Sequence, residues 1–105
     1  MGRVKRRVRR EGRTWWGLPA ELRALQVPGV RHAAYLGAPD AVLGERAVLC
    51  VESDAASAAL MPALRIALGA MPLDELHVLR SIPRDPRHRT KTDWDALERL
   101  LAGRR

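Results

Sequence analysis

The sequence predicts an α+β fold, in which a small basic N-terminal β-ribbon is followed by a three-stranded sheet flanked by helices. Three apolar stretches of strand length (30–36, 47–51 and 75–81) alternate with stretches whose leucines recur at helical spacing. The length of 105 residues suits one small domain with a modest core. We therefore expect a single domain over 1–105, with the ribbon in 1–17 and the sheet-and-helix core in 18–105.

The first segment is the most basic part of the chain. Glu11-Gly12 is a turn signal, and Thr14-Trp15-Trp16 has the side chains that strands favour. This pattern predicts a two-stranded ribbon that turns near Gly12. Its cations are Arg3, Lys5, Arg6, Arg7, Arg9, Arg10 and Arg13.

A helix and a strand are predicted next. Leu18, Leu22 and Leu25 recur at helical spacing, and Pro28-Gly29 stops the pattern. Residues 30–36 then have apolar side chains on both faces of a strand. His32 near the start of this strand has no neighbouring ligands that would indicate a metal site, so we interpret it as a surface or strand-end histidine.

A turn-rich loop over 38–45 is expected before the most buried strand. The continuous apolar run 47–51 predicts burial on both faces. Cys50 within it is interpreted as a small core residue, because no basic neighbour would stabilise a thiolate. A single cysteine cannot form an internal disulfide, which favours a reducing compartment such as the cytoplasm.

A second helix is predicted after Asp54, which is a candidate N-cap. Leu60, Leu64 and Leu68 form its apolar stripe, and residues 69–72 end it. Pro62 would kink this helix or mark its true start.

The strand predicted over 75–81 alternates, so Leu76, Val78 and Ile82 should share one face. His77 and Arg80 should then be more exposed.

The last segment is a proline-led basic loop followed by a helix. Pro83 and Pro86 keep the loop out of helix and out of a central strand, and the loop ends at Lys91. Asp93 is a candidate cap for a helix that ends at Gly103. Its apolar side carries Trp94, Leu97, Leu100 and Leu101.

The formal charge of +7 and the pI of about 11.2 favour polyanions such as nucleic acid, nucleotide phosphates or an acidic protein face. We expect no signal peptide, because Glu11 follows the first cations and no apolar stretch does. We also expect no membrane span, because the most apolar window, 55–72, is short and carries Pro62 and Arg65.

The loop 82–92 carries a motif that resembles a known family. Its spelling Ile-Pro-Arg-Asp-Pro-Arg-His-x-x-Lys is similar to the last motif of the adenylate-forming (AMP-binding) acyl-CoA synthetase superfamily. The closest branch includes fatty-acyl and olefin β-lactone synthetases. The resemblance covers nearly the whole chain, but only the small C-terminal lid domain of the family. Arg89 and Thr92 depart from the family pattern. The other matching stretches are Gly2-Arg3-Val4-Lys5, Pro19-Ala20-Glu21-Leu22 and 28–37.

The resemblance implies site residues. Lys91 would be the catalytic lysine of acyl-adenylate formation, and Arg3 would hydrogen-bond the ribose of the adenylate. Lys5 would occupy the hinge about which the domain swings, and Gly12 would face the tunnel of the thiol acceptor. ATP/AMP and coenzyme A or a carrier phosphopantetheine would be shared with a large adenylating domain that this chain lacks. Mg²⁺ would belong to the full enzyme, with none bound by this chain.

The implied function is the lid domain of an ATP-dependent ligase that adenylates an acyl or other carboxylic acid, inactive on its own. Its partners would be a large adenylating domain in cis or in trans, an acyl substrate and an acyl carrier protein. The chain would be an excised domain, a separate subunit or a relic. Two alternatives stay open from the residues: a small basic nucleic-acid-binding domain, supported by charge, and a non-catalytic interaction domain, supported by the departures at Arg89 and Thr92.

Overall fold

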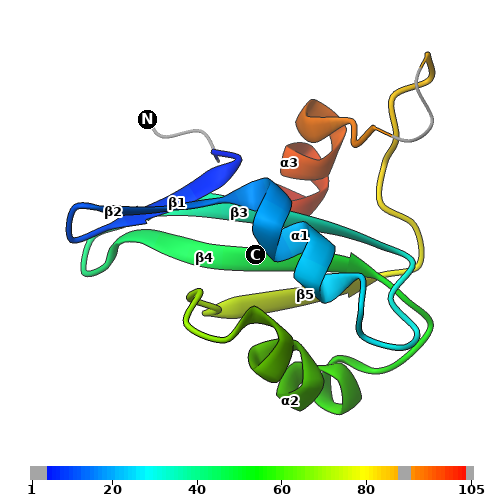
Figure 1. Ribbon diagram of the computed structural model, residues 1–105. Helices are drawn as coiled ribbons and strands as arrows, with labels where there is room; N and C mark the ends of the chain where they lie inside the picture. Colours follow the sequence, from blue (N-terminus) through cyan, green and yellow to red (C-terminus); the bar gives the residue numbers. More distant parts are fainter. Residues whose placement is uncertain (1–4, 88–90, 104–105) are drawn as a thin grey trace.

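The computed structural model describes residues 5–87 and 91–103 and shows a β-ribbon, a three-stranded sheet and three helices (Figure 1). The elements are β1 (Arg7–Arg10), β2 (Arg13–Trp16), α1 (Gly17–Ala24), β3 (His32–Asp40), β4 (Gly44–Glu52), α2 (Ser57–Leu68), β5 (Glu75–Leu79) and α3 (Trp94–Gly103). Their type and order confirm the predicted α+β fold. Among the helices of the described ranges, none is long and apolar enough to cross a membrane.

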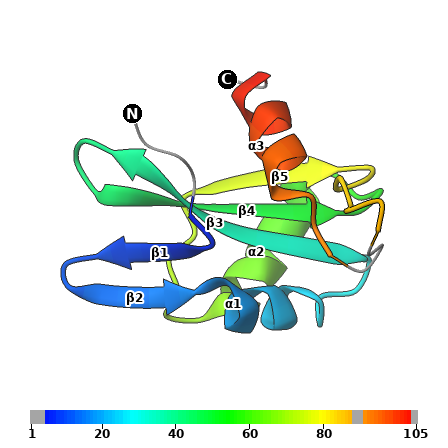
Figure 2. The ribbon, with the colours of Figure 1, turned by 90° about the horizontal axis from the view of Figure 1, so that it is seen from above.

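The sheet has the strand order β3-β4-β5, with β3 antiparallel and β5 parallel to the central strand β4. Helices α1 and α2 cover one face of the sheet, and α3 packs on the other (Figure 2). The parallel pair is joined through α2, as parallel strands require a crossover connection.

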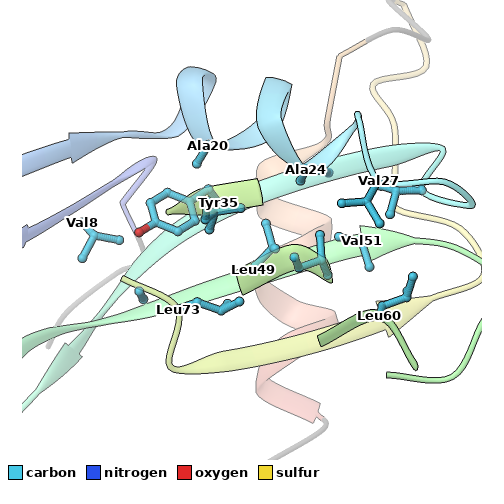
Figure 3. Close-up of a cluster of buried hydrophobic side chains, with 14 residues drawn as sticks. Val8, Ala20, Ala24, Val27, Tyr35, Leu49, Val51, Leu60 and Leu73 are labelled. Carbon is cyan, nitrogen blue, oxygen red and sulfur yellow. The ribbon is translucent and has the colours of Figure 1, made fainter. Parts of the chain in front are cut away.

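Strand β4 supplies both hydrophobic clusters, because alternate side chains of a strand point to opposite faces. Ala47, Leu49 and Val51 pack with α1 and α2 (Figure 3). Val48 and Cys50 pack on the other face, beneath α3. All five side chains are at most 1% exposed, which confirms the predicted burial of this run on both faces.

The connection between β3 and β4 is shorter than the loop predicted over 38–45. Pairing continues to Asp40 opposite Gly44, so both strands extend into the predicted loop. The Asp40 carboxylate accepts the N–H groups of Val42 and Leu43 at 2.9 Å and stabilises the turn. Pro39 was misleading because a proline is tolerated at an edge strand, where its missing N–H breaks no ladder bond.

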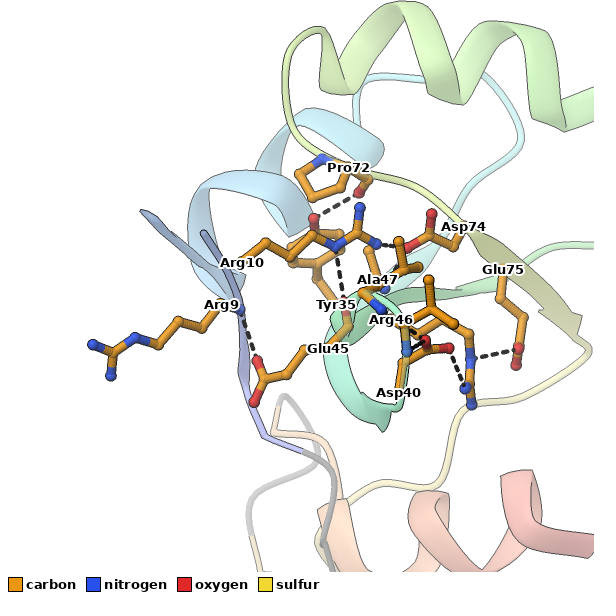
Figure 4. A network of polar contacts seen from close by, with 12 residues as sticks. Arg9, Arg10, Tyr35, Asp40, Glu45, Arg46, Ala47, Pro72, Asp74 and Glu75 are labelled. Atoms are coloured by element: carbon orange, nitrogen blue, oxygen red, sulfur yellow. Dashed lines mark hydrogen bonds and ion pairs between the residues drawn. The ribbon is translucent and has the colours of Figure 1, made fainter. Parts of the chain in front are cut away.

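The ribbon forms as predicted, with a two-residue turn at Glu11 and Gly12. Their φ values of 49° and 78° are those of the hairpin turn that favours glycine. The ribbon is fixed to the main sheet by two ion pairs, Arg7 with Glu45 at 2.8 Å and Arg10 with Asp74. Figure 4 shows the second pair, together with the bond from the Arg9 N–H to the Glu45 carboxylate.

Helix α1 presents its leucines to solvent: Leu18, Leu22 and Leu25 are 65%, 53% and 41% exposed. The small residues Gly17, Ala20 and Ala24 face the sheet instead. A Cβ at Gly17 would lie 2.8 Å from the backbone oxygen of Arg6, so the chain needs this close approach. Small inward residues let the helix lie near the sheet, and this rotation turns the leucine stripe outward.

Helix α2 buries Leu60, Leu64 and Leu68 as predicted, but its start differs. Ala56 is the N-cap and makes no side-chain cap bond, so the predicted cap Asp54 is wrong. The Asp54 carboxylate pairs with Arg31 at 3.1 Å instead. Pro62 lies inside the helix, which excludes it as the true start.

Strand β5 ends at Leu79, before the predicted limit. Leu76 and Val78 share the face of α2 as predicted, but Ile82 packs in the opposite cluster with Leu79. The alternation stops where the strand stops, so a residue beyond it does not keep the same face. The His77 side chain is 13% exposed and contacts Glu75, whereas Arg80 is exposed as predicted.

Candidate functional site

The loop that carries Lys91 consists of two paired arms. The Asp85 N–H donates to the Lys91 carbonyl and the Asp93 N–H to the Pro83 carbonyl, both at 2.9 Å. Residues 88–90 lie outside the described ranges. Asp93 also caps α3 as predicted, because its carboxylate accepts the Ala96 N–H at 3.0 Å. The loop projects at the right of Figure 1, and its arms hold Lys91 between a bridged stem and a capped helix.

Glu52 anchors the start of this loop from the end of β4. Its side chain is 7% exposed and accepts the Ile82 N–H at 2.9 Å and the Arg84 guanidinium at 3.0 and 3.1 Å. Burial alone would raise the pKa of Glu52, but the bonds from Ile82, Arg84 and Arg31 outweigh it and lower that pKa. Sequence reasoning missed this residue; its signal was a carboxylate directly after an apolar strand.

The lowered pKa of Glu52 predicts an acid-sensitive fold. The ionised carboxylate stabilises the fold above its ordinary pKa of 4.5, and this stability is lost as the pH falls through the lower folded-state pKa. We expect Glu52→Gln to lower the free energy of unfolding by about 1–2 kcal/mol at pH 7. We also expect it to reduce the loss of stability at acidic pH. Denaturant unfolding from pH 7 to pH 3 measures both effects.

Glu11→Gln, at an exposed position, is the matched control and should lose stability at acidic pH as the unsubstituted chain does. If Glu52→Gln showed the same loss of stability between pH 5 and pH 3 as the unsubstituted chain, the anchor would not be electrostatic.

His32, the first residue of β3, contacts the residue after Lys91: its Nε2 lies 2.9 Å from Thr92 Oγ1. Burial and the nearby Arg84 guanidinium lower the pKa of His32, which keeps the ring neutral at pH 7. Thr92, which departs from the family pattern, thus gives the loop a side-chain hydrogen bond to the sheet.

A pocket of about 390 Å³ lies beside Lys91, lined by Arg6, Glu21, His32, Asp85, Lys91, Thr92 and Trp94. Its cations Arg6 and Lys91 are matched by the carboxylates of Glu21 and Asp85. The Arg6 guanidinium lies 4.6 Å from the Trp94 ring centroid. Burial raises the pKa of Glu21, which the Tyr35 N–H and Arg6 only partly offset.

The Lys91 side chain is exposed and forms no ion pair with a residue of 5–87 or 91–103. The lining of the pocket thus combines two cations with two carboxylates and has little net charge. The arrangement can present one ammonium group to an anion that is held outside this chain.

Of the other predicted site residues that the structure describes, neither Lys5 nor Gly12 lines the Lys91 pocket. Gly12 lies at the ribbon turn, at the end of the molecule opposite the Lys91 loop in both Figure 1 and Figure 2. Space around it is open, since a Cβ there would meet nothing within 4 Å. Lys5 is paired with Gly37 through both its N–H and its carbonyl at 2.8 Å. Arg3 lies outside the described residues.

Much of the basic segment is engaged within the chain. Besides the ion pairs of Arg7 and Arg10, the Arg13 guanidinium lies 4.9 Å from the ring centroid of Trp15. The charge of this segment therefore contributes to the fold and is not all available to a polyanion.

In the described part of the chain, no group of three histidine, cysteine or acidic side chains is placed to hold a metal.

No protein-family model and no curated protein matches the sequence. The chain is similar in structure to the fatty acyl CoA synthetase of Mycobacterium tuberculosis, with 22% identity over 94% of this chain and 20% of that one, at a TM-score of 0.76. MbtA of Mycobacterium smegmatis matches with 28% identity over 90% of this chain and 19% of that one, at a TM-score of 0.72. The acyl-CoA synthetase of Brucella canis matches with 18% identity over 99% of this chain and 20% of that one, at a TM-score of 0.76.

The chain spans about a fifth of the length of each of these three proteins. The part that superposes is their C-terminal domain. The ribbon, the three-stranded sheet and the three helices are thus the α+β fold of the C-terminal domain of adenylate-forming acyl-CoA synthetases.

Proposed function

We propose that this chain is the C-terminal lid domain of an ATP-dependent ligase that adenylates an acyl or other carboxylic acid, of the acyl-CoA or acyl-carrier synthetase type. In this proposal Lys91 supplies the cation for acyl-adenylate formation, and the chain is inactive without a large adenylating domain. The observation that carries it is the exposed Lys91, without an ion pair in the described ranges, on a loop braced at both ends.

The proposed reaction joins two anions. A carboxylate oxygen attacks the α-phosphorus of ATP, the bond to the bridging oxygen breaks, and pyrophosphate leaves with its electron pair. Negative charge accumulates on the phosphoryl oxygens while the carboxylate approaches. An ammonium group positioned between them stabilises this charge most in the transition state, in a site that excludes water.

The stem of the loop supports this role. Glu52 fixes Ile82 and Arg84 at its start, while Asp93 fixes its end through α3. A lysine on a freely moving loop would lose conformational entropy when it enters an active site. The braced arms reduce this cost, so the ammonium reaches its target with less loss of binding energy.

The remaining assignments follow from the family resemblance. Lys5 is proposed as the hinge residue, Arg3 as the ligand of the adenylate ribose, and Gly12 as part of the surface that faces the thiol acceptor. After adenylation the lid would swing, withdraw Lys91 and turn the Gly12 end toward coenzyme A or a carrier phosphopantetheine. The ribbon turn between β1 and β2 and the loop before α3 lie at opposite ends of the molecule in Figure 2, which is consistent with two alternating faces.

The test is exchange between ATP and labelled pyrophosphate in the presence of a carboxylic acid. We expect no exchange with the isolated chain and substantial exchange with the chain joined to, or mixed with, its adenylating domain. Exchange by the isolated chain would refute the dependence on a partner. An adenylating domain that is equally active with and without this chain would refute the lid function.

A further inference from the structure

The outward side of α1 carries an apolar flank formed by Leu18, Leu22 and Leu25. A leucine stripe at helical spacing ordinarily faces the core, but these side chains are 65%, 53% and 41% exposed. Alanine and glycine take the core positions of this helix. The leucines therefore contribute apolar area that the fold of the described residues does not use.

Helix geometry places this flank beside the Lys91 pocket. Successive residues are about 100° apart around the axis, so Leu25 and Leu18 lie about 40° and about 60° beyond Glu21. Glu21 lines the Lys91 pocket. Arg23 lies on the opposite flank, where its guanidinium donates to the Leu68 carbonyl of α2 at 3.2 Å. Leu25 and Leu18 therefore lie on the flank next to Glu21, and the exposed Leu22 lies midway between Glu21 and Arg23.

We infer that the flank of Leu18, Leu22 and Leu25 is the surface on which the adenylating domain docks while Lys91 is inserted. The inference rests on the proposed function. The synthetases that match are about five times as long as this chain, which covers 20% of the Mycobacterium tuberculosis enzyme. The body that holds the ligand of Lys91 is therefore outside this chain and has to approach the side where Lys91 lies.

The Lys91 pocket and the leucine flank would contribute differently to binding a partner. The pocket beside Lys91 is polar and charge-balanced, so it contributes little net attraction to a partner. Burial of exposed leucine side chains gives roughly 25 cal/mol for each Å² removed from water. The leucine flank would supply the affinity that holds the lid in place while Lys91 acts.

The test compares Leu22→Glu and Leu25→Glu with Ile66→Glu in the enzyme that combines this chain with its adenylating domain. Ile66 is 82% exposed on α2, away from the Lys91 pocket, so it is a matched apolar control. We expect both leucine variants to lower ATP–pyrophosphate exchange at least about tenfold, and thioester formation from supplied acyl-adenylate to change less. Ile66→Glu should leave both rates within about twofold. Leu22→Gln tests the same position without a new charge, and thermal unfolding of the isolated variants verifies that they fold.

Lys91→Ala separates this inference from the proposed function. If Lys91→Ala abolishes exchange while the leucine variants keep it, the docking surface is wrong and the lid function stands. If Lys91→Ala leaves exchange intact, the lid function itself fails. Sedimentation equilibrium of the isolated chain should show a monomer. A dimer that Leu22→Glu dissociates would mean that a second copy covers the flank and would overturn the inference.

Discussion

Lys91→Ala should lower the rate of acyl-adenylate formation by about 10²–10³, the loss typical of removing one positioned group that stabilises developing charge. The side chain is exposed and is not ion-paired within 5–87 and 91–103, so its removal should leave the fold intact. ATP–pyrophosphate exchange by the enzyme that contains this chain and its adenylating domain measures the loss. Thioester formation from supplied acyl-adenylate should stay within about threefold, because the amine acts only while the anhydride forms.

Arg87→Ala is the matched control, since it removes an exposed cation from the same loop. We expect it to change the exchange rate less than threefold. Lys91→Arg should recover little activity, because the planar guanidinium does not reproduce a compact ammonium charge. Equal losses in Lys91→Ala and Arg87→Ala would show that the loop contributes only general positive potential.

Gly37→Ala should destabilise the fold by about 3 kcal/mol, at the upper end of the cost of overpacking a close-packed site. A Cβ at Gly37 would overlap the backbone oxygen of Arg7, where no flexible side chain can move aside. The cost corresponds to a melting temperature lower by roughly 10–20 °C for a domain of this size. Thermal unfolding followed by circular dichroism measures it.

Gly103→Ala provides the comparison, because a Cβ there meets nothing within 4 Å at the end of α3. It should be neutral or slightly stabilising, as alanine favours helix over glycine. A Gly37→Ala melting temperature within a few degrees of that of Gly103→Ala would mean that β1 separates from β3 at little cost.

The sequence predicts those elements that depend on residues close together along the chain. The apolar run ending at Val51 was assigned to a strand buried on both faces, and the turn at Gly12 and the cap at Asp93 were found from residue type alone. These features depend on neighbours in the sequence. The start of α2 was missed because Asp54 bonds to Arg31, a contact between segments that are distant along the chain.

The orientation of α1 and the anchor of the Lys91 loop could not be read from the sequence for the same reason. The spacing of Leu18 and Leu22 specifies a helix but not which side meets the sheet, which the close approach at Gly17 decides. A carboxylate directly after an apolar run marks Glu52 as unusual, but its partner Arg84 lies 32 positions later in the chain, so the sequence does not reveal the contact. Sequence periodicity fixes local conformation, whereas these features depend on tertiary contacts.

If Lys5 is the hinge of a lid domain, as proposed, its pairing with Gly37 bears on how quickly the lid turns. Both peptide groups that flank the Lys5 α-carbon are hydrogen-bonded to Gly37, so its φ and ψ are restrained by the edge of β3. In the proposed hinge motion, rotation about Lys5 would break these two bonds, and their opening would then contribute to the barrier between the two orientations. The turnover rate of such an enzyme would then depend on how often the two hydrogen bonds between Lys5 and Gly37 open. Amide hydrogen exchange at Lys5 and Gly37 would report this opening rate.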